Sequence, residues 1–189
     1  MPPPRLAAVL YEPGCGRVVD QLLVGLVRSL AERGLKLAGT IQSAAEREDR
    51  CACDMIVTDL ATGEARSISE DRGPLATGCR LDSSALEAAA GSTMAALEAG
   101  ADLLIVNKFG KREAEGGGFR AALAFALGEG IPAVVAVNRS QIEAWRQFAG
   151  DLARELPADA ADVERWCEEA LAGTPRARTA GLPLASTAP

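Results

Sequence analysis

The sequence contains no histidine, and its lysine and arginine residues are outnumbered by aspartate and glutamate, 20 to 26. Without an imidazole, the chain cannot run a mechanism that needs a histidine base, including one built on a Ser-His-Asp arrangement. The net charge of −6 excludes a general nucleic-acid binder, because affinity for the phosphate backbone comes from clustered basic residues. Basic groups are left to act at a local site.

Long apolar runs are absent as well. No stretch approaches the roughly 18 apolar residues that cross a bilayer. The Met-Pro-Pro-Pro start lacks the charged and apolar regions of a signal peptide. We therefore expect a cytoplasmic protein with no membrane insertion.

Cysteine is sparse, with five residues. This odd number in a chain with no export signal indicates reduced thiols rather than a disulfide framework. Cys51 and Cys53 leave two interpretations open, a metal site or ordinary thiols, although no histidine is present to complete a zinc site. Cys79 either packs as a small buried hydrophobe or reaches the site from a nearby hairpin.

Apolar residues, by contrast, make up 48% of the 189 residues, enough for one sizeable core. We expect a single domain over residues 1–173. Residues 174–189 are rich in proline, alanine, threonine and arginine, which is typical of a disordered tail.

Strand and helix patterns alternate along the predicted domain. The predicted strands are 6–10, 35–41, 55–60, 65–69, 103–106 and 131–137. The predicted helices are 22–30, 82–97, 119–127, 141–148 and 161–171. A loop is expected over 43–50, and the Thr62-Gly63 pair predicts a hairpin turn. The alternation predicts an α/β fold with three layers, in which a mostly parallel sheet carries an antiparallel hairpin.

The loop after the first predicted strand has the frame of a P-loop with altered residues. In a P-loop, G-x-x-x-x-G-K-[ST] surrounds a phosphate with backbone N–H groups at a helix N-terminus. With Gly16 at the second glycine position, Tyr11 stands at the first. Arg17 replaces the lysine, and Val18 replaces the hydroxyl that would hold Mg²⁺. The predicted binding residues of this degenerate P-loop are Gly14, Cys15, Gly16, Arg17, Val18 and Val19.

A second apolar strand, 103–106, leads into Asn107 and Lys108. In P-loop proteins this strand normally ends in an acidic residue near the metal. With Asn107 there, both expected Mg²⁺ ligands are missing. Backbone amides and Arg17 can still hold an anion, since neither needs a metal. We therefore predict that Asn107 and Lys108 join the loop around a small anionic ligand, with no metal ligand identified.

The residues after this strand are candidates for catalysis. Lys108, Lys111 and Arg112 form a basic run that is either a solvated loop or one side of an anion pocket. Glu113 is predicted to position a water or a metal, and Lys111 is the second candidate catalytic residue. Asp20 either stabilises the helix dipole or replaces a lost metal ligand.

The order of these pieces resembles that of the thermophile-type nucleoside triphosphatases, small P-loop enzymes that hydrolyse nucleoside triphosphates. The matching stretches are Gly14–Val19, Gly39–Gln42, Asp59–Gly63 and Asn107–Glu113. The resemblance implies a P-loop-NTPase-like fold. The Gly-Lys-x-Glu portion of the last stretch is retained, whereas the acidic pair before it has become Asn107-Lys108.

A closer resemblance is to an uncharacterised bacterial family that is related to those enzymes and often encoded near molybdate-transport genes. It rests on Gly78–Asp82, Asn107–Glu113 and Gly118–Arg120, and it spans Leu6 to Trp166. The resemblance implies a place in molybdate or molybdenum-cofactor metabolism.

Three classes of function follow. The first, which the lost metal ligands favour, is a nucleotide- or oxyanion-binding protein with weak or absent hydrolysis, whose ligand is a nucleoside triphosphate or molybdate. The second is a Mg²⁺-dependent nucleoside triphosphatase in which Asp20 or Glu113 takes over metal ligation. The third is an adaptor that uses the P-loop fold as a scaffold for a molybdenum-pathway protein or a second copy of itself.

Overall fold

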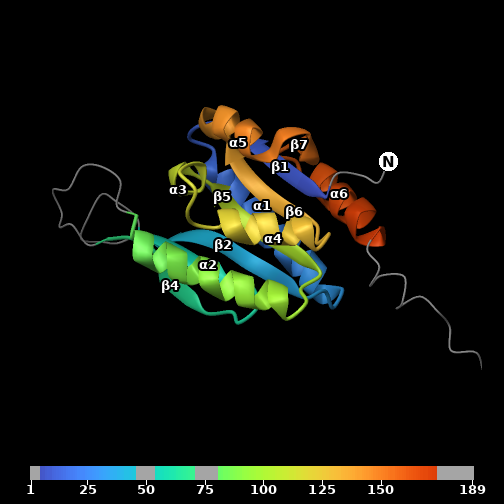
Figure 1. Cartoon of the computed structure of the whole chain (residues 1–189), viewed down its shortest axis with the longest axis horizontal. Coiled ribbons are helices and arrows are strands. Elements are labelled where there is room, and N and C mark those ends of the chain that lie inside the picture. The colour runs from blue at the N-terminus through green and yellow to red at the C-terminus, as the bar shows by residue number, and fades with distance from the viewer. Residues whose placement is uncertain (1–4, 46–53, 71–80, 174–189) are drawn as a thin grey trace, which may run out of the picture.

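A computed structural model describes residues 5–45, 54–70 and 81–173, which fold around one sheet (Figure 1). Its seven strands lie in the order β4-β3-β2-β5-β6-β1-β7. The strands are β1 Leu6–Tyr11, β2 Leu37–Ala45, β3 Asp54–Asp59, β4 Ala65–Ser67, β5 Leu103–Phe109, β6 Ala133–Asn138 and β7 Ala153–Pro157. The predicted tail and Cys51, Cys53 and Cys79 lie outside the described residues.

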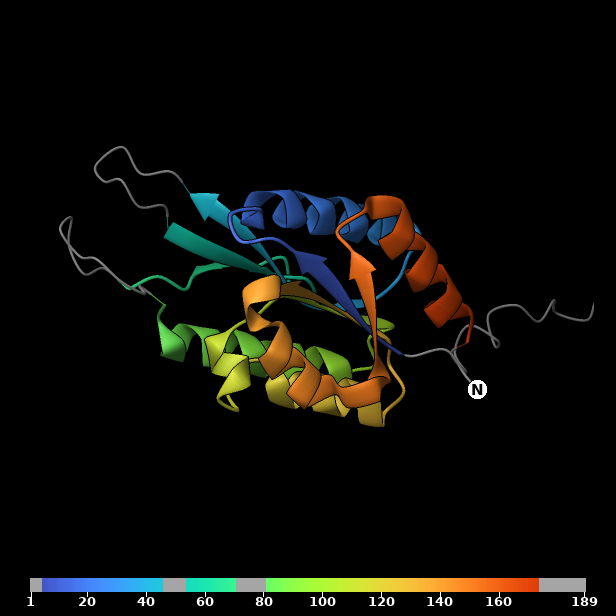
Figure 2. The ribbon, with the colours of Figure 1, turned by 90° about the horizontal axis from the view of Figure 1, so that it is seen from above.

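Helices cover both faces of this sheet. The helices are α1 Gly16–Glu32, α2 Ser83–Glu98, α3 Lys111–Ala114, α4 Arg120–Gly128, α5 Ile142–Ala149 and α6 Ala160–Ala172. Short 3-10 turns, Arg139–Gln141 and Gly150–Leu152, flank α5. Figure 2 shows α1 and α6 on one side of the sheet and α2, α4 and α5 on the other. The predicted three-layer α/β architecture is confirmed.

The sheet is parallel except at one edge. β2, β5, β6, β1 and β7 run in the same direction. β3 pairs antiparallel with β2 and with β4, so the predicted hairpin is confirmed. This arrangement is compatible with a P-loop-NTPase-like fold, in which ligands bind beyond the carboxyl ends of the parallel strands.

The central strands are apolar because the helices bury both of their faces. Alternate residues of β1 enter different cores. Ala7 and Val9 pack with the buried residues of α1 and α6, whereas Ala8 and Leu10 pack with those of α2, α4 and α5. This two-sided burial explains why β1, β5 and β6 read as unbroken apolar runs.

Among the differences from the predicted strands, three arise from strand pairing. The loop expected from residue 43 is wrong at its start, because residues 43–45 continue β2 by pairing with β3. β5 extends to Phe109 instead of ending at Val106. β7 was not predicted: its sequence, Ala-Arg-Glu-Leu-Pro, has no continuous apolar run, and it becomes a strand by pairing with the edge of β1. In all three places, pairing with a neighbouring strand determines the strand structure, and the local sequence pattern does not.

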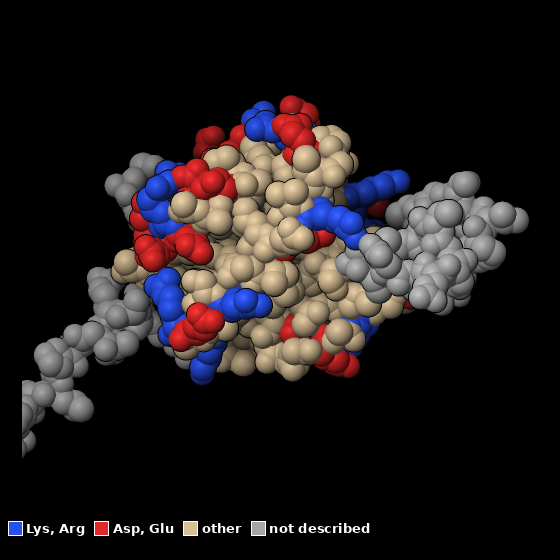
Figure 3. Space-filling model, turned by 180° about the vertical axis from the view of Figure 1, so that it is seen from behind, with Lys and Arg blue, Asp and Glu red and all other residues tan. Residues whose placement is uncertain are grey.

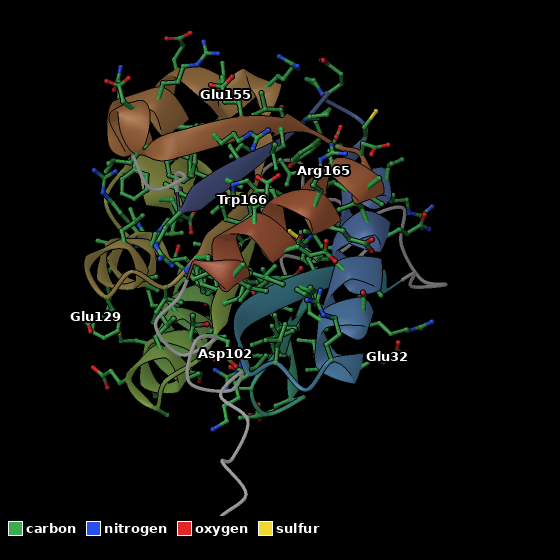
Figure 4. All side chains as sticks on the ribbon, turned by 90° about the vertical axis from the view of Figure 1, so that its right-hand side faces the viewer. Glu32, Asp102, Glu129, Glu155, Arg165 and Trp166 are labelled. Atoms are coloured by element: carbon green, nitrogen blue, oxygen red, sulfur yellow. The ribbon has the colours of Figure 1, made fainter. Side chains whose placement is uncertain are left out.

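The carboxyl ends of β2 and β5 and the start of α1 lie at the left of Figure 1. β6 separates β1 from β5, so the loop after β1 and the end of β5 are one strand apart. Figure 4 looks onto the opposite edge, where Glu32 ends α1 and Trp166 lies on α6. There the Asp102 carboxylate accepts the N–H of Lys36 at 2.8 Å, which joins the starts of β2 and β5.

Candidate functional site

The loop after β1 is a tight turn that ends at the start of α1. Tyr11, at the first P-loop glycine position, is the last buried residue of β1. The N–H of Cys15 donates to the carbonyl of Glu12 at 3.0 Å. Between them Gly14 has a φ of +86°, a conformation that favours glycine. The turn delivers the chain directly into α1 at Gly16.

The start of α1 presents backbone N–H groups and an arginine. The first N–H groups of a helix lack intrahelical acceptors and carry partial positive charge. The Cys15 carbonyl accepts the N–H groups of Val18 and Val19, at 3.1 and 3.4 Å. Arg17 and Val18 are exposed, whereas Val19 is fully buried under the helix. Val19 therefore contributes packing beneath the site.

The end of β5 reaches α1 through two polar side chains. Asn107 donates from Nδ2 to Asp20 Oδ1 at 3.1 Å, and Lys108 Nζ lies 3.7 Å from the same oxygen. A Cβ atom placed on Gly16 would lie 3.7 Å from Lys108 Nζ. The structure thus brings the two predicted motifs together and places the Lys108 ammonium beside the first residue of α1.

Asp20 occupies the fifth position of α1, one residue past its first turn. Its side chain is 15% exposed and is held by Asn107 and Lys108. Asp20 therefore links α1 to β5, and its two predicted roles, partner of the helix dipole and substitute metal ligand, stay predictions. Asp20 lines a groove of about 250 Å³, here called the α1 groove. Its lining residues are Arg17, Asp20, Gln21, Val24, Gln42 and Ser43.

A second concavity, here called the β5 hollow, lies on the α2 side of the sheet and measures about 230 Å³. Its apolar wall consists of Met55, Val57, Ile68, Leu81, Leu86 and Phe119. Its polar lining includes Thr40, Gln42, Asn107, Lys108, Arg112 and Glu113. Gln42 lines both concavities, so they adjoin at the end of β2.

Asn107 has one unpaired polar atom. The residue is 3% exposed, and its Oδ1 has no hydrogen-bond partner among the described residues. A buried acceptor without a donor costs free energy, so such atoms are rare unless a ligand or water completes them. The Asn107 side chain therefore donates through Nδ2 to Asp20, while its Oδ1 accepts no hydrogen bond from the described residues.

Glu113 is a buried carboxylate that joins two backbone segments. It is 3% exposed; Oε2 accepts the N–H of Gly110 at 2.9 Å and Oε1 accepts that of Phe119 at 3.1 Å. Burial raises the pKa of Glu113, while the two N–H donors oppose that shift. These contacts cap α3 and position the entry to α4. A catalytic role for Glu113 stays a prediction.

Gly117 and Gly118 lie close to the carboxylates of Glu87 and Glu113. Glu87 Oε1 accepts the N–H of Gly118 at 2.8 Å and Arg112 Nη2 at 2.9 Å. A Cβ atom on Gly118, where φ is +56°, would overlap Glu113 Oε1. Glycine is required there by close approach as well as by backbone conformation.

Lys111, the other predicted catalytic residue, lies on the surface. Its side chain is 85% exposed and its ammonium is 3.7 Å from Glu115, one turn along the chain. Exposed pairs of this kind add little stability. Lys111 borders the β5 hollow, and its catalytic role stays a prediction.

The sequence matches a family described as "Protein of unknown function (DUF2478)" over residues 6–166. The chain belongs to this family. The matched span is the one over which the sequence was expected to resemble an uncharacterised family. The further resemblance to thermophile-type nucleoside triphosphatases stays a prediction.

A relative of this DUF2478 chain is "Molybdenum import ATP-binding protein ModC 2" of Bradyrhizobium diazoefficiens, 35% identical over 164 residues. The alignment covers 87% of this chain and 18% of that protein. The chain therefore spans less than a fifth of its relative's length. No solved structure matches the DUF2478 chain.

Three further observations concern the described part of this DUF2478 chain: its surface charge, its metal-ligand groups and the length of its apolar helices. On the face shown in Figure 3, basic and acidic side chains are interspersed. Within residues 5–45, 54–70 and 81–173, no group of three or more acidic or cysteine side chains could hold a metal ion. No helix in those ranges is long and apolar enough to span a membrane.

Several residues of the site had no sequence signal. Glu87 lies in an alanine-rich helix, and nothing in its spacing indicates contact with Gly118, 31 positions away. Met55 and Val57 were predicted as hairpin residues, but not as a wall of the β5 hollow. Gln42, at the end of the stretch Gly39–Gln42 that carried the resemblance to P-loop enzymes, lines the α1 groove together with Arg17.

Proposed function

We propose that this protein binds an oxyanion, the phosphate of a nucleotide or molybdate, at the start of α1 without a resident metal ion. The observation that carries the proposal is the position of Lys108. Its ammonium lies beside Gly16, at the helix end where backbone N–H groups also favour an anion. β5 thus supplies the positive charge that a P-loop takes from its own helix.

Arg17 and Lys108 have complementary donors for this task. A guanidinium presents a planar fork that matches two oxygens of one anion, whereas an ammonium acts as a point charge with three donors. Lys108 is 3.7 Å from Asp20, which leaves donors for a ligand. Backbone N–H groups at the start of α1 add further hydrogen-bond donors for the oxygens of the anion.

The ligand class draws support from the relative. Its printed name combines molybdenum import with ATP binding. Molybdate and phosphate are tetrahedral anions of similar charge, so the same amides and basic side chains can hold either. We propose both as candidates and place the protein in a molybdenum-related pathway.

Calorimetry tests this proposal directly. The wild type is titrated with ATP, GTP, phosphate and molybdate, with Mg²⁺ and then with EDTA, alongside Arg17→Ala. We expect binding of at least one ligand to persist in EDTA and to weaken about tenfold or more in the variant, as for the loss of a charge-assisted hydrogen bond. Absence of binding to all four contradicts the proposal and leaves a scaffold whose partners would be sought by pull-down.

Asp20 supports a second candidate, a Mg²⁺-dependent nucleoside triphosphatase. Its carboxylate lines the α1 groove with Gln42 and Ser43, whose oxygens are the kind that Mg²⁺ accepts. The variant Asp20→Asn distinguishes anion binding without a metal from Mg²⁺-dependent nucleoside triphosphate hydrolysis. If Asp20 only pairs with Lys108, the variant removes a repulsive charge and anion affinity in EDTA rises several-fold. If Asp20 holds Mg²⁺, the variant loses Mg²⁺-dependent binding and hydrolysis.

A further inference from the structure

The Lys108 ammonium is shared between the proposed anion site and the carboxylate of Asp20. It lies 3.7 Å from Asp20 Oδ1, and it borders Gly16 at the start of α1. A hydrogen bond from an ammonium to a ligand oxygen spans about 2.8 Å. Such an oxygen therefore lies within about 6.5 Å of Asp20 Oδ1. Every anion that Lys108 holds is close to this second negative charge.

Asp20 is held beside Lys108 by a contact from β5. Asn107 Nδ2 donates to Asp20 Oδ1 at 3.1 Å, and the Asp20 side chain is 15% exposed. The other carboxylate oxygen, Oδ2, accepts no hydrogen bond from the described residues, yet it is not sealed from solvent. Asp20 therefore keeps one accessible oxygen for a further donor in the α1 groove, which it lines.

The charge of Asp20 acts on both sides of the start of α1. Among the described lining residues of the α1 groove, Arg17 and Asp20 are charged and the others are neutral. Burial raises the pKa of Tyr11, its hydrogen bond with Asn138 opposes that rise, and the negative charge of Asp20 adds to it. The field of Asp20 therefore reaches the end of β1, where the loop to α1 begins.

A carboxylate discriminates between oxyanions by their protons. It accepts hydrogen bonds and donates none, so beside a fully ionised oxyanion it meets only acceptors and a like charge. At a separation of about 6.5 Å, each additional negative charge on the ligand weakens binding roughly threefold to a hundredfold, depending on the effective dielectric constant. A protonated oxyanion carries less charge, and its O–H group can donate a charge-assisted hydrogen bond to the carboxylate.

We infer that Asp20 makes the anion site selective for an oxyanion that carries a proton, so that the site holds phosphate in preference to molybdate or sulfate. This inference rests on the proposed function and chooses between its candidate oxyanions. At neutral pH, phosphate keeps at least one proton, whereas molybdate and sulfate keep none. Asp20 is thus the specificity-determining residue, while Arg17, Lys108 and the backbone N–H groups supply the affinity that all three anions share.

Calorimetry of the full chain tests this selectivity with phosphate, sulfate and molybdate, in EDTA at neutral pH and fixed ionic strength. The wild type should bind phosphate about tenfold or more tightly than sulfate and molybdate. Asp20→Asn removes the charge and keeps the shape of the side chain. It should strengthen sulfate and molybdate binding about tenfold and leave phosphate affinity within about threefold, so that the preference disappears.

Asp151→Asn is the matched control, because it makes the same change of charge in an exposed side chain. Asp151 precedes β7, which runs parallel to β1, so it lies at the edge of the sheet opposite the anion site. This variant should keep the preference for phosphate. Thermal melting checks that both variants are folded, and the wild-type preference carries the test if Asp20→Asn is not.

The outcomes separate this inference from the proposed function. Wild-type binding of sulfate or molybdate as tightly as phosphate overturns the inference and leaves the anion site standing. An equal loss of affinity for all three anions in Asp20→Asn shows a merely structural role and also overturns it. Absence of binding by all three anions overturns the inference and, if ATP and GTP fail as well, the proposed function.

Discussion

At the scale of single residues, Glu113 and Glu87 make opposite predictions about pH although both hold the segment around Gly118. Burial raises the pKa of Glu113. The N–H of Gly118 and then the Arg112 guanidinium lower the pKa of Glu87. Glu113 therefore stabilises the fold most when it is protonated, and Glu87 stabilises it most when it is ionised.

Glu113 should lose its stabilising contribution as pH rises. Because its folded pKa is raised, that contribution is fully present below the unfolded pKa and is lost as pH rises through the folded value. We expect the difference in unfolding free energy between the wild type and Glu113→Gln to shrink with rising pH. Urea denaturation between about pH 4 and pH 7 measures it. A difference that grows with pH would contradict this prediction. It would show that the N–H donors of Gly110 and Phe119 stabilise the ionised carboxylate by more than burial destabilises it.

Glu87 should show the reverse dependence. Its lowered pKa gives a contribution that is present above the unfolded pKa and is lost as pH falls through the folded value. Glu87→Gln should therefore destabilise the protein more at neutral pH than in acid, in a denaturation series extended down to about pH 3. A constant difference across the range would contradict the bonds to Gly118 and Arg112.

At the scale of secondary-structure elements, two glycines have opposite roles. Gly25 lies exposed within α1, and a Cβ atom there meets nothing within 4 Å. Gly39 in β2 has a φ of +108°, and a Cβ atom there would overlap the carbonyl of Ile105 in β5. β2 and β5 can approach each other only because residue 39 is glycine.

Alanine at these positions should move stability in opposite directions. Gly25→Ala should raise the unfolding free energy by about 0.5–1 kcal/mol, because glycine in a helix interior costs that much relative to alanine. Gly39→Ala should lower it by more than about 1–2 kcal/mol, the cost of the left-handed conformation alone for alanine. Denaturant titration measures both, and a stabilised Gly39→Ala protein would contradict the close strand contact.

Elements could be predicted from the sequence where local pattern and burial agree. The apolar run 103–106 sits at the centre of the sheet and is buried on both faces, so its pattern sufficed. β7 could not be predicted, since only β1 beside it makes those five residues a strand. For the same reason, the sequence predicted that Asn107 and Gly16 take part in one binding site, but it did not predict the hydrogen bond between Asn107 and Asp20. That contact depends on the order of the strands in the sheet.

At the scale of the whole molecule, an acidic chain keeps a small basic site at one end of its sheet. The net charge is −6, yet Arg17 and Lys108 lie near the start of α1. Their charges come from different elements, α1 and β5, so the fold assembles the site. Salt should weaken anion binding only modestly, because few charges take part.

The central claim is that Lys108 supplies from β5 the charge that a P-loop takes from its helix. The most direct measurement is calorimetric titration of inorganic triphosphate, in EDTA, into the wild type, Lys108→Met and Lys36→Met. Lys36 lies at the opposite edge of the sheet, before β2, and serves as the control. The account predicts at least about tenfold weaker binding in Lys108→Met and wild-type affinity in Lys36→Met. Equal affinities in all three proteins would contradict it.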